Sequence, residues 1–97
     1  MTVNELVIKM ADIFENDYIK DNDFDNFKDM VSCYWYTAQD IKEEVLANMR
    51  DYTDDFDDDG DYVGRDAEDA TDGFVSYRSF IKRVYDELDR RGLYDYE

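Results

Sequence analysis

The stretch SYRSFIKRVYDELDRRG, residues 76–92, carries the clearest structural signal in this chain. Its apolar residues recur at the three- and four-residue spacing of one helix face: Tyr77, Phe80, Ile81, Val84 and Leu88. Ser76 is a favourable N-cap residue, and Gly92 after two arginines is a typical helix stop. The stretch therefore predicts an amphipathic helix over 76–91, which must bury its apolar face against other elements.

Three further stretches show the same helical period. They predict helices over 3–15, 23–35 and 38–52. Asn22 or Asp23 is expected to cap the second of these, and Thr37 is expected to cap the third, with Asp40 at its third position. The chain is thus predicted to be a single all-α domain over residues 1–97, a small bundle of about four helices with a long acidic loop over 53–73.

The net charge limits the possible partners. The 97 residues are 43% hydrophobic, which indicates a folded chain, and they carry a net charge of -16. Nucleic acids and anionic membranes repel such a surface, so we expect no direct contact with either, and we expect basic partners instead. The sequence has no apolar stretch of membrane-spanning length and no signal-peptide pattern, which predicts a soluble, intracellular protein.

Catalysis is not expected. The chain has no histidine and only one cysteine, Cys33, which therefore has no histidine to activate it. We expect Cys33 to be partly buried on the second helix. No glycine-rich phosphate-binding loop is present. These observations predict a protein that is not an enzyme and that has no cofactor.

The acidic stretch, residues 51–73, holds the densest charge. Three uses compete for it: a calcium loop, an imitation of nucleic-acid phosphates, or a solvated linker. Gly60, Gly64 and Gly73 interrupt it, and a short strand or hairpin around Tyr62–Val63 is possible. A structureless loop of this length is uncommon in a compact domain.

The calcium alternative can be tested in two registers. With Gly60 at the sixth position of an EF-hand loop, oxygen ligands fall at Asp55, Asp57, Asp59, Asp61 and Asp66. In that register, Tyr62 occupies an aliphatic position and two glycines disfavour an exit helix. With Gly73 at the sixth position, the flanking residues fit but the ligands fail, because Ser79 stands where a bidentate acid is required. Neither register satisfies both requirements.

In size, charge and composition, the whole chain resembles small acidic inhibitors of phages and mobile elements, the anti-CRISPR and anti-restriction proteins that act as DNA mimics. The resemblance implies a basic nucleic-acid-binding partner, such as an RNA-guided nuclease or a restriction enzyme, in the cytoplasm of a bacterial host. A generic acidic protein-binding module is the alternative. The candidate partner-binding residues are Asp54, Asp55, Asp57, Asp58, Asp59, Asp61, Tyr62 (as an aromatic anchor), Asp66, Glu68, Asp69 and Asp72.

Overall fold

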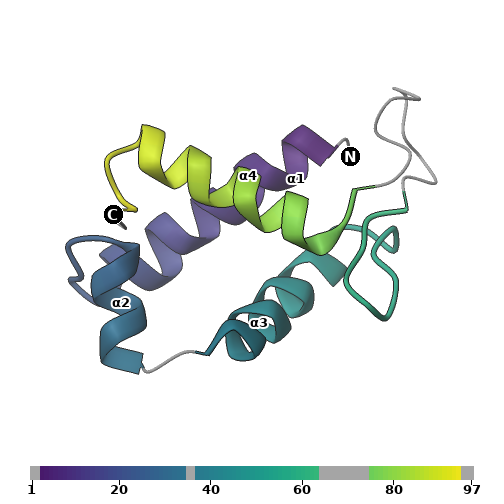
Figure 1. The fold of residues 1–97 in the computed structure, drawn as a ribbon. Helices are drawn as coiled ribbons and strands as arrows, with labels where there is room; N and C mark the ends of the chain where they lie inside the picture. The colour runs from purple at the N-terminus through teal and green to yellow at the C-terminus, as the bar shows by residue number, and fades with distance from the viewer. Residues whose placement is uncertain (1–2, 35–36, 64–74, 95–97) are drawn as a thin grey trace.

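The computed structural model describes residues 3–34, 37–63 and 75–94 and confirms the all-α fold (Figure 1). Its elements are α1 (Val3–Ile13), the π-helix η1 (Phe14–Lys20), α2 (Phe27–Tyr34), α3 (Ala38–Arg50) and α4 (Tyr77–Arg90). Within these ranges, the only β pairing consists of two isolated bridges around Tyr62. None of the described helices is long and apolar enough to cross a membrane.

The helix ends of α3 and α4 follow the sequence signals. Thr37 and Asp40 form a reciprocal capping box at the start of α3, in which each side chain accepts a hydrogen bond from the other residue's backbone N–H. The Ser76 hydroxyl accepts from the backbone N–H of Ser79 at the start of α4. Gly92 has a φ of 74°, the left-handed conformation that a glycine adopts readily after a helix.

The region between α1 and α2 differs from the prediction. The chain does not leave the helix at residue 15; it continues as η1 to Lys20. The wider π turn places residues five apart on one face, which buries both Phe14 and Ile19. The second helix also begins later than residue 23, because Asp23 has a φ of 60° and lies outside helical geometry. Its cap is Asn26, whose side-chain oxygen accepts from the N–H of Asp29, so the predicted Asn22 or Asp23 cap is wrong.

Two side chains near the ends of helices lie at the surface. Cys33 is exposed rather than partly buried. Tyr52 follows the apolar stripe of α3, but its ring is 43% exposed and lies under the ammonium group of Lys9, 4.8 Å from the ring centroid. Neither residue contributes to the buried core.

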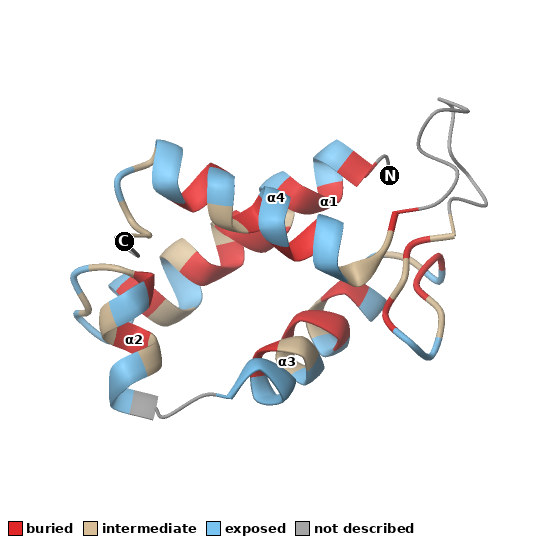
Figure 2. Cartoon of the chain, in the orientation of Figure 1, coloured by how far each residue is buried: buried red, intermediate tan, exposed pale blue. Residues whose placement is uncertain are grey.

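The core lies between α1, α3 and α4. In Figure 2 the buried stripes of these helices face one another, while pale exposed residues cover the outer faces. Leu6 and Met10 of α1, Met49 of α3 and Phe80 and Leu88 of α4 are completely inaccessible or nearly so. At the opposite end from the N-terminus, Phe27 of α2 packs edge-on against Phe14, with ring centroids 4.9 Å apart.

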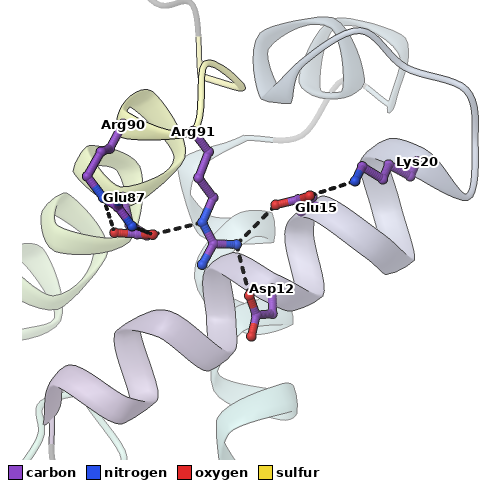
Figure 3. Close-up of polar contacts among 6 residues, drawn as sticks. All are labelled: Asp12, Glu15, Lys20, Glu87, Arg90 and Arg91. Atoms are coloured by element: carbon purple, nitrogen blue, oxygen red, sulfur yellow. Dashed lines mark hydrogen bonds and ion pairs between the residues drawn. The ribbon is translucent and has the colours of Figure 1, made fainter.

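An ion-pair network joins the end of α4 to α1 and η1 (Figure 3). The guanidinium of Arg91 donates to Glu87 Oε2 at 2.8 Å, to Asp12 Oδ1 at 2.9 Å and to Glu15 Oε1 at 3.1 Å. Arg90 donates to both carboxylate oxygens of Glu87. The bidentate contact with Arg90, together with Arg91, lowers the pKa of the Glu87 carboxyl from 4.5 to about 2.

We expect Glu87→Gln to lower the free energy of unfolding by about 1–3 kcal/mol at neutral pH, since it removes the charge of a buried carboxylate that accepts three hydrogen bonds from Arg90 and Arg91. The pKa of Glu87 is depressed in the folded state, so its contribution is complete above pH 4.5 and is lost as the pH falls toward 2. Urea denaturation at pH 7 and pH 3 measures both effects, and the difference between wild type and variant should shrink at the lower pH.

Asp86→Asn is the matched control for this prediction. Asp86 forms an exposed pair with Lys82 one turn along α4, and such pairs contribute about 0.3–0.5 kcal/mol. Equal losses for the two variants would contradict a stabilising role for the network.

Candidate functional site: the acidic hairpin

Residues 54–63 form a short antiparallel hairpin with a tight turn, which we call the acidic hairpin. The N–H of Asp57 donates to the carbonyl oxygen of Asp61 at 2.9 Å, and the N–H of Val63 donates to that of Asp55 at 2.8 Å. Phe56 and Tyr62 lie opposite one another between these two pairs. The most acidic part of the sequence therefore has a defined backbone, in agreement with the short hairpin that the sequence suggested.

Two aromatic side chains attach the hairpin to the core. Tyr62 is 0% exposed and Phe56 is 6% exposed. The Phe56 ring packs edge-on against both Tyr62 and Phe80 of α4, with centroids 5.6 and 5.1 Å apart. Tyr62 also exchanges two backbone hydrogen bonds with Val75, just before α4. Tyr62 thus differs from the exposed partner anchor that we expected, because its ring is needed inside the molecule.

The turn of the hairpin rests on α3. Gly60 is buried with a φ of 87°, and a Cβ atom at this position would lie 3.1 Å from both Leu46 Cδ1 and Lys42 Cε. Asp58 and Asp59 line a cleft of about 320 Å³ between the hairpin and α3, together with Lys42 and Arg50. The turn is therefore held close to the outer face of α3.

Three carboxylates gather at the tip of the hairpin. One oxygen from each of Asp57, Asp59 and Asp61 lies within 4.8 Å of the other two. Asp57 Oδ1 accepts from the backbone N–H groups of Asp59 and Asp61, and Asp61 Oδ1 accepts from the N–H of Tyr77 at the start of α4. These backbone donors fix the positions of two of the three carboxylates.

Tyr77, the first residue of α4, also contacts α3. The Tyr77 ring lies under the ammonium group of Lys42, 5.2 Å from the centroid. Burial raises the pKa of the Tyr77 hydroxyl to about 12, so the ring stays neutral at physiological pH. The hairpin, α3 and the first turn of α4 therefore form one contiguous surface.

Asp54 and Asp58 are exposed on the hairpin. Within the described ranges, no ion pair involves these two residues or the three clustered aspartates. The ion pairs among the described residues involve Asp12, Glu15, Asp86 and Glu87 instead. The hairpin therefore presents negative charge that no described lysine or arginine neutralises through a direct ion pair.

Asp55 departs most from what its residue type predicts. It is only 2% exposed, and its Oδ2 atom has no hydrogen-bond partner in the described part of the structure. Charged side chains are almost never this buried without a partner, because removing a carboxylate from water is costly. Asp55 is therefore not available at the surface as the exposed partner contact that we expected.

The remaining predicted site residues, Asp66, Glu68, Asp69 and Asp72, lie outside the described residues. The last ligand of the calcium register centred on Gly60 falls among them. In the register centred on Gly73, Ser79 stands at the last ligand position. Its hydroxyl and its backbone N–H both bond to the hydroxyl of Ser76, the N-cap of α4. The structure thus brings together Asp57, Asp59 and Asp61 from the predicted ligand set.

A second acidic surface was missed by the sequence reasoning. Asp17, Asp21, Asp23 and Asp25 are all exposed in η1 and the turn after it. This turn lies at the opposite end of the molecule from the hairpin (Figure 1). The alternation of acids and aromatics in ENDYIKDNDFD was the available signal, but it is weaker than that of the hairpin sequence.

Fold and site together define a small all-α domain that carries an acidic hairpin. Comparisons with protein-family models, with curated proteins and with solved structures found no match for the chain.

We expect Gly60→Ala to destabilise the protein by about 2–3 kcal/mol. A left-handed backbone costs a non-glycine residue about 1–2 kcal/mol, and the added methyl group would also press on Leu46 and Lys42. Thermal or urea unfolding measures the loss. Gly92→Ala is the control, because Gly92 has a φ of 74° with no atom within 4 Å of the added methyl, so only the cost of about 1–2 kcal/mol remains. A smaller loss at Gly60 than at Gly92 would show that the hairpin turn does not pack on α3.

Proposed function

We propose that this chain is an acidic inhibitor that imitates the phosphates of DNA and occupies the basic nucleic-acid-binding groove of a bacterial defence nuclease. Such nucleases include RNA-guided nucleases and restriction enzymes, whose grooves bind phosphates through lysine and arginine. The observation that carries the proposal is the acidic hairpin: its exposed carboxylates are fixed by a folded backbone and have no ion pair with any described cation. The protein would act in the cytoplasm of the bacterial host.

Preorganisation favours this function over that of a flexible acidic tail. A disordered segment loses conformational entropy when it binds, whereas the hairpin is already held by Phe56, Tyr62 and Val75. The exposed Asp54 and Asp58 flank the buried Phe56, so their backbone positions are fixed by the core. A fixed array of charges can match a fixed array of lysines and arginines.

Electrostatic steering supports the same mode of action. A net charge of -16 on 97 residues attracts a basic groove over long range and accelerates association, most strongly at low salt. The acidic turn with Asp17 and Asp21 extends the negative surface to the far end of the molecule. Inhibition would be stoichiometric, since the chain blocks the groove without chemistry.

The alternative is a generic acidic module that binds basic proteins without entering a nucleic-acid site. Affinity capture from a bacterial lysate, repeated with added duplex DNA, distinguishes the two. Capture of a nuclease that DNA displaces supports the proposal. Capture only of basic proteins that DNA leaves bound would replace it with the generic module.

For the captured nuclease, we expect the double variant Asp54→Asn, Asp58→Asn to bind about tenfold or more weakly, because close charge pairs across an interface contribute at least about 1.5 kcal/mol. The dependence of affinity on salt should also become shallower. Titration calorimetry or surface plasmon resonance at two salt concentrations, with a chelator present, measures both changes.

The matched control removes the same charge at the other end of the molecule, with Asp17→Asn and Asp21→Asn. Its effect should be smaller than that of the hairpin variant. If the two double variants weaken binding equally, net charge alone explains the attraction, and the hairpin is not the contact surface.

A further inference from the structure

Ile8 is an exposed aliphatic side chain on the outer face of α1. It is 41% exposed, and Tyr52 is the one other large hydrophobic residue that is exposed in the described part of the chain. The Tyr52 ring has the Lys9 ammonium group over it, whereas Ile8 borders two shallow hollows of about 370 and 330 Å³. The hollows adjoin at Ile8 and form one concave face (the α1–α4 face), bordered by Asn4, Glu5, Ile8, Asp12, Arg83 and Arg90.

The two helices of this face carry opposite charge on their exposed sides. On α1 the bordering acids are Glu5 and Asp12, while the ammonium group of Lys9 lies over the Tyr52 ring. On α4 the exposed side chains include four cations and two acids: Arg78, Lys82, Arg83, Asp86, Asp89 and Arg90. Arg83 forms no ion pair within the described ranges. An acidic strip and a basic strip thus lie on the two sides of Ile8.

The helices α1 and α4 lie side by side and run in the same direction (Figure 1). The guanidinium of Arg91, at the C-cap of α4, donates to Asp12 near the end of α1, which brings these two ends together. A two-fold axis along the groove between the helices would therefore place α1 of each copy over α4 of the other. The acidic strip of each copy would then face the basic strip of its partner, and the two Ile8 side chains would meet at the axis.

We propose that the α1–α4 face binds a second copy of the chain in a two-fold symmetric dimer. A wholly acidic partner would be repelled by the acidic strip of α1, and a wholly basic partner by the basic strip of α4. The partner that fits carries both strips in the reverse order, and a two-fold axis presents the chain to itself in that way. The remaining surface of a chain with a net charge of -16 repels a second copy, but this repulsion is screened over ~8 Å at ~0.15 M salt.

The dimer and the proposed inhibitor function are independent. None of the hairpin residues 54–63 lines either hollow, so both copies keep their acidic hairpins exposed. Dimerisation is measured on the isolated chain, with variants at Ile8 and Arg83, whereas nuclease binding is tested with variants at Asp54 and Asp58. Failure of one result therefore leaves the other standing.

The first test is sedimentation equilibrium over a concentration series from micromolar to millimolar. We expect a reversible equilibrium between monomer and dimer that persists as the salt concentration rises from ~0.05 to ~0.5 M, because screening weakens the repulsion between acidic surfaces and leaves the apolar contact intact. Ile8→Gln should weaken dimerisation by about tenfold or more, since each dimer loses two buried aliphatic side chains. Ile8 is already exposed in the monomer, so the variant keeps its fold, which thermal unfolding verifies.

The charge pairing is tested with Arg83→Glu, which should weaken dimerisation by about tenfold, because it places an acid opposite the acidic strip of the partner. Lys28→Glu is the matched control, with the same change in net charge on an exposed cation of α2, away from the face. It should change the dissociation constant by less than about twofold. Equal effects of the two variants would show that net charge alone governs association, and would overturn the assigned face.

Disulfide formation locates the contact. Two cysteines can be joined only when their Cα atoms lie within about 7 Å of each other, so Ile8→Cys combined with Cys33→Ser should cross-link two chains under a mild oxidant. Wild type, whose exposed Cys33 reports random collisions, is the control, and it should cross-link at least about tenfold more slowly. Equal rates, a monomer at every concentration, or association that disappears at high salt would each overturn the dimer.

Discussion

The burial of Phe56 and Tyr62 is the constraint on which the acidic hairpin depends. A segment with this density of carboxylates is well solvated as an open chain, and nothing in its charge favours folding. Each buried ring contributes about 1.5–3 kcal/mol, and the Phe56 ring packs against both Tyr62 and Phe80 of α4. The backbone pairing of Tyr62 with Val75 then ties the hairpin to the first residues before α4. Apolar contacts therefore determine where the negative charges lie.

The distribution of cations completes this arrangement. Arg90, Arg91 and Lys20 are engaged in the network that joins the end of α4 to α1 and η1 (Figure 3). The hairpin adjoins the other end of α4 (Figure 1). The network offsets self-repulsion where the helices pack most closely, while the hairpin carboxylates lack ion pairs with any described cation. The ion-pair network and the acidic hairpin thus lie at opposite ends of α4.

Local signals predicted the helices, whereas the hairpin depends on contacts between distant residues. The apolar stripes and the Thr37, Ser76 and Gly92 signals were sufficient for α3 and α4, because caps and periodicity act within a few residues. The π-helix was missed, since its wide turn is set by the burial of Phe14 and Ile19 in the finished core. The Asp57, Asp59 and Asp61 group was visible as spacing around Gly60. The burial of Tyr62 and Asp55 was not, because residue type alone favours neither an inward tyrosine in an acidic run nor a buried aspartate.

The hairpin holds its carboxylates in three different surroundings. Asp57, Asp59 and Asp61 bring one oxygen each within 4.8 Å of one another, and Asp55 is not part of that group. A groove lined with lysine and arginine requires carboxylates that diverge into solvent, and Asp54 and Asp58 do so. Asp55 directly precedes the buried Phe56, is only 2% exposed and has an Oδ2 atom without a hydrogen-bond partner among the described residues. The buried Phe56 ring therefore holds exposed outer carboxylates and one buried inner carboxylate on the same short segment.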